Sequence, residues 1–283
     1  MANGDFHTHS THSDGKKTTA ELAELAARAG LHVMALTDHD STAGVREIAA
    51  ALGPHGIRLV PGVELSTDIP GSEVHVLGYF MQIDDPAFQA QLARFREGRL
   101  GRGMRMIEKL QGLGMDVSWE RVQGIAGDAS VGRPHVAQHL VERGYVQSIP
   151  EAFDRLIGRN GPAYAEREKL TPVEAVQMIR NAGGFPVVAH PHYTPDAETI
   201  LAGLAGQGLG GMEVYYKDLG PEKVGELLAI ARRLKLLPTG GSDYHALHNP
   251  GEREPGDIPL PDEAVEALLA AGEGCACPVV AAS

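Results

Sequence analysis

The chain has 283 residues, of which 43% are apolar and 22% are charged, and its formal net charge is −12. This length suits one barrel-type domain, or one domain with an insertion. The negative charge argues against tight binding to long nucleic acid, which needs a broad basic surface. No uncharged stretch is long and apolar enough to span a bilayer, and the first residues lack the features of a signal peptide. We therefore expect a cytoplasmic protein that does not bind membranes.

Short apolar runs that are typical of buried strands alternate with helical patterns at both ends of the chain. The predicted strands are residues 3–7, 32–37, 57–64, 73–80, 185–190, 211–216 and 236–241. The predicted helices are residues 19–29, 43–52, 172–182, 196–205, 221–235 and 261–271. Such alternation predicts an α/β protein with a parallel sheet, closed or open.

The middle of the chain, residues 85–170, breaks this rhythm. Helical patterns occupy residues 86–112, 134–143 and 150–157, separated by glycine-rich turns and without a clear strand. We expect a helical insertion between two parts of the α/β domain, residues 1–84 and 171–283. An insertion on the ligand-bearing side would make a lid. The alternative is that these helices only cover the surface of the barrel.

Histidine and acidic residues recur where the predicted strands end. These residues are His7, His9, Asp14, His39, Glu64, His75, His190, Asp243 and His245. In parallel α/β folds the carboxyl ends of the strands carry the catalytic residues, and imidazole and carboxylate groups are ligands of divalent transition metals. Nine such groups could hold two or three ions, and a polynuclear site most often hydrolyses a phosphate ester.

The spacing within this set supports a shared site. His7 and His9 project from one face of an extended segment because side chains alternate along a strand, and Asp243 and His245 repeat this geometry. Each residue alone has a simpler interpretation: Asp14 could belong to a turn, and His75 or His190 could be a core histidine. His248, beyond the second pair, is expected in a surface loop.

These segments resemble the PHP (polymerase and histidinol phosphatase) phosphoesterases. The stretch HTHSTHSDG at residues 7–15 resembles the first motif of that family, TDHD at 37–40 the second and GVE at 62–64 the third. AHP at 189–191 and GSDYH at 241–245 resemble the later motifs. The resemblance implies a distorted (β/α)7 TIM-like barrel with a helical insertion. It also implies that all nine residues are ligands of two or three divalent ions, most often manganese, with iron or zinc as alternatives.

Within this family the chain is most similar to the branch that hydrolyses nucleoside 3′,5′-bisphosphates and trims short RNA from its 5′ end. The similarity lies in the helical insertion and in residues 96–99, 132–137 and 161–164. It implies a metal-dependent phosphatase that removes the 3′-phosphate, with a possible 5′–3′ exonuclease activity. The expected partner is a small phosphorylated substrate such as a nucleoside bisphosphate or short oligoribonucleotide. No obligate protein partner is evident.

Metal-assisted hydrolysis assigns roles to several side chains, because coordination lowers the pKa of water to roughly 7 from 15.7. Asp14 is expected at the catalytic centre. Arg133 is the candidate clamp for a substrate phosphate, since its planar fork matches phosphate geometry. The alternative for Arg133 is an exposed arginine at a helix start. His192 could protonate the leaving oxygen or bind a phosphate, and His135 is expected to face the substrate at most.

A run of basic residues between positions 94 and 109 forms a local stripe in this acidic chain. Arg99 and Arg102 share a helix face and could bind the second phosphate of a bisphosphate. The alternative is a solvated helix face. Cys275 and Cys277 are too closely spaced and too few for a disulfide scaffold. They are either a redox or metal-binding pair or, as we expect, two reduced thiols.

Three other functions remain open. One is a phosphatase that acts on histidinol phosphate or another small phosphometabolite. Another is a metal-dependent amide hydrolase, because barrels with similar ligands also serve that chemistry. The third is a non-catalytic metal-binding module. Phosphate bound in the site would favour phosphate chemistry over amide hydrolysis.

Overall fold

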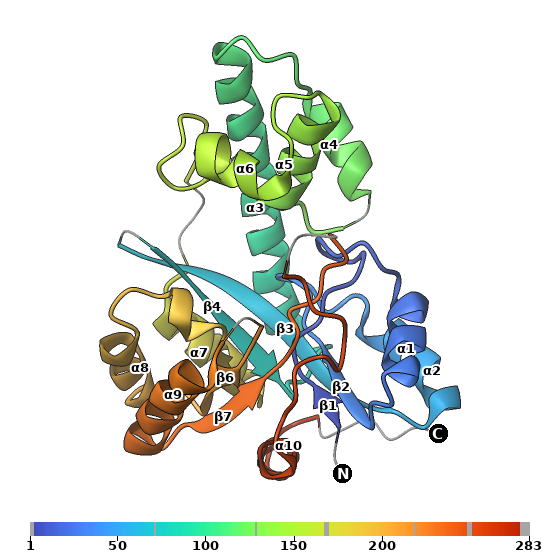
Figure 1. Ribbon diagram of the computed structural model, residues 1–283, viewed down its shortest axis with the longest axis vertical. Helices are drawn as coiled ribbons and strands as arrows, with labels where there is room; N and C mark the ends of the chain where they lie inside the picture. Colours follow the sequence, from blue (N-terminus) through green and yellow to red (C-terminus); the bar gives the residue numbers. More distant parts are fainter. Residues whose placement is uncertain are drawn as a thin grey trace.

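Seven strands of the described chain form one curved sheet in the order β1 to β7. The computed structural model describes residues 3–277, except for 71, 128, 167–169, 218 and 248–250, so the prediction for His248 lies outside the described residues. The strands are β1 Gly4–Asp5, β2 Val33–Leu36, β3 Arg58–Ile69, β4 Ser72–Tyr79, β5 Phe185–Val188, β6 Gly211–Tyr215 and β7 Leu237–Gly240. The sheet wraps around a common core to give the expected distorted barrel (Figure 1).

The barrel closes where the chain beyond β1 meets the chain beyond β7. The Phe6 N–H donates a 3.3 Å hydrogen bond to the Gly240 carbonyl, and the Asp243 N–H donates a 2.8 Å bond to the His7 carbonyl. Thr8 and Tyr244 form an isolated parallel bridge. These bonds join the two ends of the chain, so the segments that carry the first and last predicted ligands lie side by side.

The expectation of a wholly parallel sheet is wrong for β4. This strand pairs antiparallel with β3, from Gly62 opposite Tyr79 to Ile69 opposite Ser72, and antiparallel with β5. Only two residues separate β3 from β4, and a parallel connection needs a crossover of about a dozen residues or more. Because β4 runs in reverse, its beginning lies at the edge where the parallel strands end.

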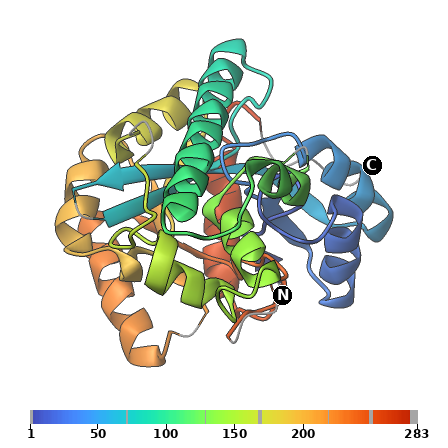
Figure 2. The same cartoon turned by 90° about the horizontal axis from the view of Figure 1, so that it is seen from above.

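Helices pack around the outside of the barrel, which Figure 2 shows from above. They are α1 Thr19–Arg28, α2 Val45–Leu52, α7 Pro172–Asn181, α8 Ala197–Ala205, α9 Pro221–Leu234 and α10 Asp262–Gly272. Short 3₁₀ turns occur at η1 Gly53–His55 and η3 Pro191–Tyr193. Thr18 and Thr171 each form a capping box with a glutamate three residues later. These boxes satisfy backbone N–H groups that the first helical turn leaves unpaired, so α1 and α7 begin where the sequence predicts.

The remaining helices stand above the ligand-bearing edge of the barrel (Figure 1). They are α3 Pro86–Gly112, α4 Trp119–Ala126, α5 Arg133–Glu142 and α6 Ile149–Ala152, which continues into a π-helical turn, η2 Phe153–Ile157. The sequence did not predict α4. The long helix α3 packs Phe88 and Leu92 against the barrel core, whereas its Met106 and Leu110 belong to a separate core of the helical segment. It thereby ties the two parts together.

The segment's own core is built from apolar side chains of α3, α4, α5 and the turns between them. It includes Ile107, Val122, Val136, Leu140 and Leu156.

None of the described helices is both long and apolar enough to cross a membrane.

Closure of the barrel should depend on glycine at position 241. A Cβ atom there would lie 2.5 Å from the His7 nitrogen and 2.8 Å from Asp5 Oδ1, too close for either to stay in place. We expect Gly241→Ala to lower the free energy of unfolding by about 1–3 kcal/mol in urea titrations. Gly225→Ala, in α9 with nothing within 4 Å, is the control and should be neutral or slightly stabilising. Equal stability of the two variants would contradict this close approach.

Candidate metal centre

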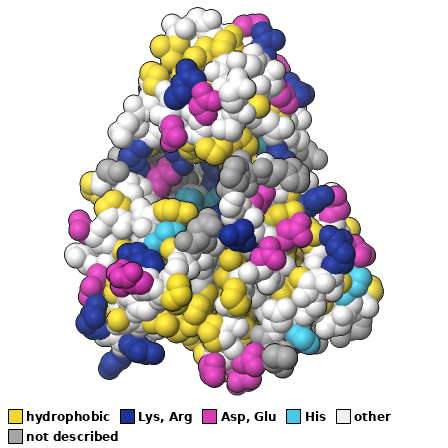
Figure 3. Space-filling view, in the orientation of Figure 1, with side chains coloured by type: hydrophobic (Ala, Val, Ile, Leu, Met, Phe, Trp, Pro, Cys, Tyr) yellow, Lys and Arg dark blue, Asp and Glu magenta, His cyan; other side chains and the backbone are white. Residues whose placement is uncertain are grey.

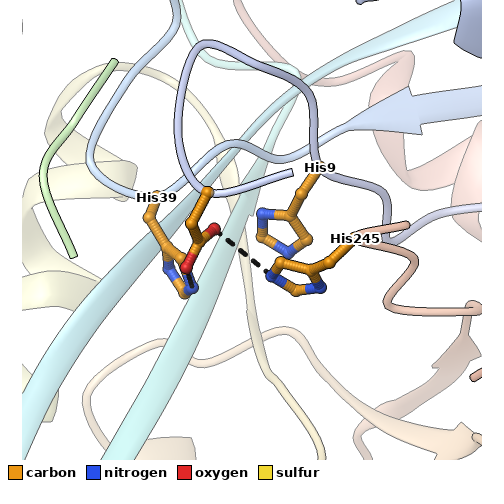
Figure 4. Close-up of side chains that lie close together, drawn as sticks. His9, His39 and His245 are labelled. Atoms are coloured by element: carbon orange, nitrogen blue, oxygen red, sulfur yellow. Dashed lines mark ion pairs between the residues drawn. The ribbon is translucent and has the colours of Figure 1, made fainter. Parts of the chain in front are cut away.

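All nine predicted ligand side chains converge at the edge of the barrel beneath the helical segment. Figure 4 shows the rings of His9, His39 and His245 pointing toward one another. Asp14 lies among them, with its carboxylate oxygens 3.3 Å from His245 Nε2 and 3.8 Å from His39 Nε2. Glu64 and Asp243 connect these groups to the remaining histidines, so the set forms one continuous cluster.

Glu64 is the centre of the cluster and is 1% exposed. One of its oxygens, Oε2, lies 3.2 Å from His7 Nε2, His9 Nε2 and His39 Nδ1. The other, Oε1, lies 2.8 Å from His75 Nδ1 and 3.3 Å from His190 Nε2. Both oxygens of this carboxylate, each with histidine nitrogens beside it, could therefore serve as metal ligands.

The ligand atoms fall into groups of the size that one ion needs. Three sets each place their ligand atoms within 4.8 Å of one another: His9, Asp14, His39 and His245; His7, His9, Glu64 and Asp243; and His39, Glu64 and His75. Two atoms that bind one ion at about 2.0–2.2 Å lie about 3 Å or slightly more apart. The separations around Glu64 match that spacing.

Two buried side chains carry atoms that approach charged neighbours without forming a hydrogen bond. Among the described residues, both ring nitrogens of His9 and Oδ1 of Asp14 are buried and make no hydrogen bond, although His9 Nε2 lies 3.2 Å from Glu64 Oε2 and Asp14 Oδ1 lies 3.3 Å from His245 Nε2. Burying such a group unpaired costs about 1–3 kcal/mol. Coordination to a cation would satisfy these atoms, so the nitrogen and oxygen ligands present fit a divalent transition metal.

The protonation states show how strongly the carboxylates attract positive charge. Burial alone would lower the pKa of His7 and His9, yet nearby carboxylates raise the pKa of His7 well above its usual value and that of His9 to about 9. Burial likewise opposes ionisation of Glu64, but the surrounding histidines hold its pKa well below the usual range. By contrast, burial lowers the pKa of His39 to about 3. Without metal, protons on His7 and His9 therefore balance the carboxylate charge.

Several residues that the sequence analysis missed hold the ligands in place. Glu213, on β6, lies 3.0 Å from His7 Nδ1 through one oxygen and accepts a 2.6 Å hydrogen bond from the His190 N–H through the other. Asp243 Oδ2 accepts hydrogen bonds from the Tyr216 hydroxyl at 2.5 Å and from Lys217 Nζ at 3.2 Å. A carboxylate within the apolar strand at 211–216 was the signal that could have identified Glu213.

Two of the predicted ligands have backbone conformations that residues other than glycine rarely adopt. The φ angles of His190 and Asp243 are 31° and 50°, in the left-handed region that costs roughly 1–3 kcal/mol for a residue other than glycine. Such conformations persist where surrounding contacts impose them, and they gather at functional sites. At His190 the bond from its N–H to Glu213 is one such contact.

A cavity of about 190 Å³ opens directly onto the cluster (Figure 3). It is lined by four of the predicted ligands, Asp14, His39, His75 and His245, and by Arg99, Arg102 and Arg133 of the helical segment. Arg99 Nε is 2.5 Å from Asp40 Oδ2, and Arg102 donates a 2.9 Å hydrogen bond to the Ala165 carbonyl. The three arginines that were predicted to bind substrate phosphates therefore lie beside the cluster. They do not form a solvent-exposed helix face.

A second cavity, of about 320 Å³, adjoins the first. The two share Glu73, His75 and Arg133, and the second adds Arg159 and Tyr193, a residue that is 62% exposed. The sequence pattern predicted no role for Glu73, Arg159 or Tyr193. Basic and aromatic side chains next to a metal cluster can bind the phosphate and base of a nucleotide.

Two predicted site residues lie elsewhere. His135 is 2% exposed, and its Nδ1 accepts a 2.9 Å hydrogen bond from the Gly132 N–H. It therefore secures the start of α5 and lines neither cavity. The His192 ring packs on Tyr193 and Tyr216, with centroids 3.9 and 4.9 Å away, and also lines neither cavity. Burial lowers the pKa of His192 to about 4, so the ring is neutral at pH 7 and poorly suited to donate a proton.

Cys275 and Cys277 are free thiols.

Comparison with known proteins agrees with this fold. A family model described as the PHP domain matches residues 5–157, more than half of the chain. The chain therefore belongs to the PHP-domain family, and its architecture is that of a metal-dependent phosphoesterase.

Three relatives span most of the chain. It is 34% identical over 257 residues to a 3′,5′-nucleoside bisphosphate phosphatase from Chromobacterium violaceum, with 89% of each chain covered. It is 32% identical to the 5′–3′ exoribonuclease Rnm of Salmonella typhimurium, covering 85% of this chain and 84% of the relative. It is also 32% identical to a phosphoribosyl 1,2-cyclic phosphate 1,2-diphosphodiesterase from Eggerthella lenta, covering 85% and 93%.

Two solved structures have the same fold over nearly the whole chain. A protein from Bifidobacterium adolescentis, classed as a metal-dependent phosphoesterase, superposes with a TM-score of 0.86 at 31% identity, covering 95% of this chain and 96% of the other. A protein from Chromobacterium violaceum, titled an amidohydrolase with bound sulfate and no metal, superposes with a TM-score of 0.88 at 30% identity, covering 100% and 99%.

Glu213 should matter for metal affinity although it is not one of the nine predicted ligands. Glu213→Ala removes the acceptor that orients His7 and His190, and we expect a ten- to hundred-fold loss of metal affinity, the usual effect of such orienting groups. Glu213→Gln keeps an oxygen acceptor and should lose less. The measurement is competition with a chelating dye, with Glu198→Ala, an exposed residue of α8, as control. Unchanged affinity in Glu213→Ala would contradict the orienting role.

Stability of the metal-free protein should fall as the pH rises, whereas stability of the metal-bound protein should not. The raised pKa of His9 adds stability to the metal-free protein below about pH 6.5, and this is lost as the pH rises toward about 9. The lowered pKa of His39 has the opposite effect, but only near pH 6.5, because the unfolded ring loses its proton just above that pH. We expect the melting temperature of chelator-treated protein to fall by several degrees between pH 6.5 and 9. With Mn²⁺ it should not fall, because metal replaces the protons. In His9→Ala the metal-free decrease should shrink, and an undiminished decrease would contradict this assignment.

Proposed function

We propose that this protein is a metal-dependent phosphatase that removes the 3′-phosphate of nucleoside 3′,5′-bisphosphates and trims short RNA from its 5′ end with the same site. The observation that carries the proposal is that the metal-ligand cluster and the arginines of the helical segment line one cavity. Two of the relatives described above, the bisphosphate phosphatase and the exoribonuclease, support the choice of substrate.

We propose that the nine clustered side chains hold two or three divalent ions, with Mn²⁺ as the preferred metal. His7, His9, Glu64 and Asp243 would hold one ion, and Glu64, His75 and His190 a second. Asp14, His39 and His245 would hold a third. Ions bound there would supply Lewis acidity, lowering the pKa of water to roughly 7.

The protein's own side chains would bind and orient the phosphates. Arg133 and Arg102 line the cavity together with His75, and their planar N–H donors can bind phosphate oxygens in pairs. Arg99 is anchored by Asp40 and also donates a 2.5 Å hydrogen bond to Ser66 Oγ. It would place a fixed positive charge near Asp14.

The helical segment, residues 85–170, acts in this proposal as a lid on a barrel made of 1–84 and 171–283. Two features support it: Arg133 comes from α5, and Phe153 of η2 lines the same cavity as the metal ligands. The barrel alone would therefore lack all three arginines of this cavity and also Phe153. A lid that brings in phosphate-binding groups also excludes water from the reaction.

Phosphatase activity on histidinol phosphate is the nearest alternative, and amide hydrolysis is a second. Amide hydrolysis is supported by the structural neighbour titled an amidohydrolase. The sulfate bound to that protein, however, has the shape of a phosphate. Neither alternative explains why so many arginines surround the cavity, because a single phosphate or an amide requires fewer of them.

Phosphate release decides between these functions. With Mn²⁺, purified protein should release phosphate faster from adenosine 3′,5′-bisphosphate than from histidinol phosphate. His9→Ala should lose the activity, and Arg133→Gln should raise KM roughly ten-fold or more, the loss expected for a hydrogen bond to a charged group. Preference for histidinol phosphate would overturn the substrate. No release from either substrate, with metal shown to be bound, would favour amide hydrolysis or a non-catalytic role.

A further inference from the structure

Glu73 lies between two of the arginines that face the metal cluster. It is on β4, two residues before His75, and its side chain is 18% exposed. Its Oε1 is 3.3 Å from Arg102 Nη2, while its Oε2 forms a close ion pair with Arg133 Nη2. Glu73 and Arg133 line both cavities. The carboxylate therefore stands at the junction of the two spaces that a substrate would fill.

A carboxylate shared by two guanidinium groups takes a position that suits a phosphate. Arginine binds both anions through the same planar fork of N–H donors. A terminal phosphate carries about −1.5 to −2 charges at pH 7, whereas a carboxylate carries one. A phosphate group that reaches this position can therefore exchange with Glu73 and gain electrostatic energy.

The two arginines have other contacts that would hold them after such an exchange. Arg102 donates to the Ala165 carbonyl at 2.9 Å, and its guanidinium lies 5.3 Å from the centre of the Tyr164 ring. The Arg133 guanidinium lies 5.0 Å from the centre of the Phe153 ring. Moving Glu73 aside would thus leave a prepared pair of cations for the incoming anion.

We propose that Glu73 is a specificity-determining residue that occupies the anion position between Arg102 and Arg133 until a second phosphate of the substrate displaces it. The proposal rests on the function proposed above and deepens it. Substrates without a second phosphate leave Glu73 in place and gain nothing from the arginine pair. Bisphosphates bind the pair but must first break the Glu73 contacts, which lowers their affinity and eases release of the product.

The competition can be measured with Glu73→Gln, which keeps the shape of the side chain and removes its charge. KM for adenosine 3′,5′-bisphosphate should fall, and the gain in kcat/KM should be roughly five-fold larger than for adenosine 3′-monophosphate, the upper range for an ion pair that solvent still reaches. In Glu73→Gln/Arg133→Gln this gain should disappear. Glu142→Gln, which breaks an exposed pair with Arg121 in the same helical segment, is the matched control and should show no such bias.

The same exchange can be tested without catalysis by measuring the affinity of the metal-free protein for sulfate by calorimetry. Glu73→Gln should bind sulfate several-fold more tightly than the native protein, and Arg133→Gln more weakly. If the bisphosphate is not a substrate but sulfate still behaves in this way, the proposed function fails and the role of Glu73 stands. Two results would overturn the proposal: weaker sulfate binding in Glu73→Gln, or an equal change in kcat/KM for both nucleotides. Either result would indicate that Glu73 only holds β4 and the helical segment together.

Discussion

The structure depends on one buried carboxylate, that of Glu64, which five histidines surround. An ionised carboxylate out of water is strongly destabilising unless opposite charge or coordination compensates it. In the metal-free protein, protons on His7 and His9 supply part of that compensation, and divalent ions can replace them. Five imidazoles can reach one carboxylate only if strand ends from both halves of the chain converge, and the barrel provides that convergence.

The reversal of β4 brings together two ligands that are close in sequence, whereas the rest of the barrel brings together ligands that are far apart in sequence. Glu64 and His75 are eleven residues apart and meet across a hairpin at 2.8 Å, so this part of the cluster is local in sequence. His190 reaches the same oxygen of Glu64 from 126 residues away, at 3.3 Å. The hairpin can form early because it closes a short loop, and the later strands then complete the cluster around it. We infer that the local pair sets the position to which the distant ligands are added.

The sequence predicted the cluster better than it predicted the surroundings of the cluster. All seven strands and most helices follow from apolar periodicity and capping residues, and the nine converging side chains follow from their recurrence at strand ends. Periodicity carries no information on strand direction, so the reversal of β4 was missed although the short connection indicated it. Glu73 and Glu213 were missed because their importance comes from contacts across the fold. His135 was expected to face the substrate at most, whereas its Nδ1 accepts a hydrogen bond from the Gly132 N–H, a local contact that the sequence pattern does not reveal.

An acidic protein with a net charge of −12 can still bind a highly charged anion, because the field inside a cleft is set locally. The arginines around the two cavities are each paired with a carboxylate: Arg99 with Asp40, Arg102 and Arg133 with Glu73, and Arg159 with Asp68. All four arginines belong to the helical segment and all three carboxylates to the barrel, so these pairs join the two parts, whereas unpaired guanidinium groups would repel one another across a small, partly dehydrated space. Paired, they stay in place without substrate. Glu73 contacts two arginines at once through its carboxylate, so the pair that it bridges is a place where an anion finds two cations already aligned.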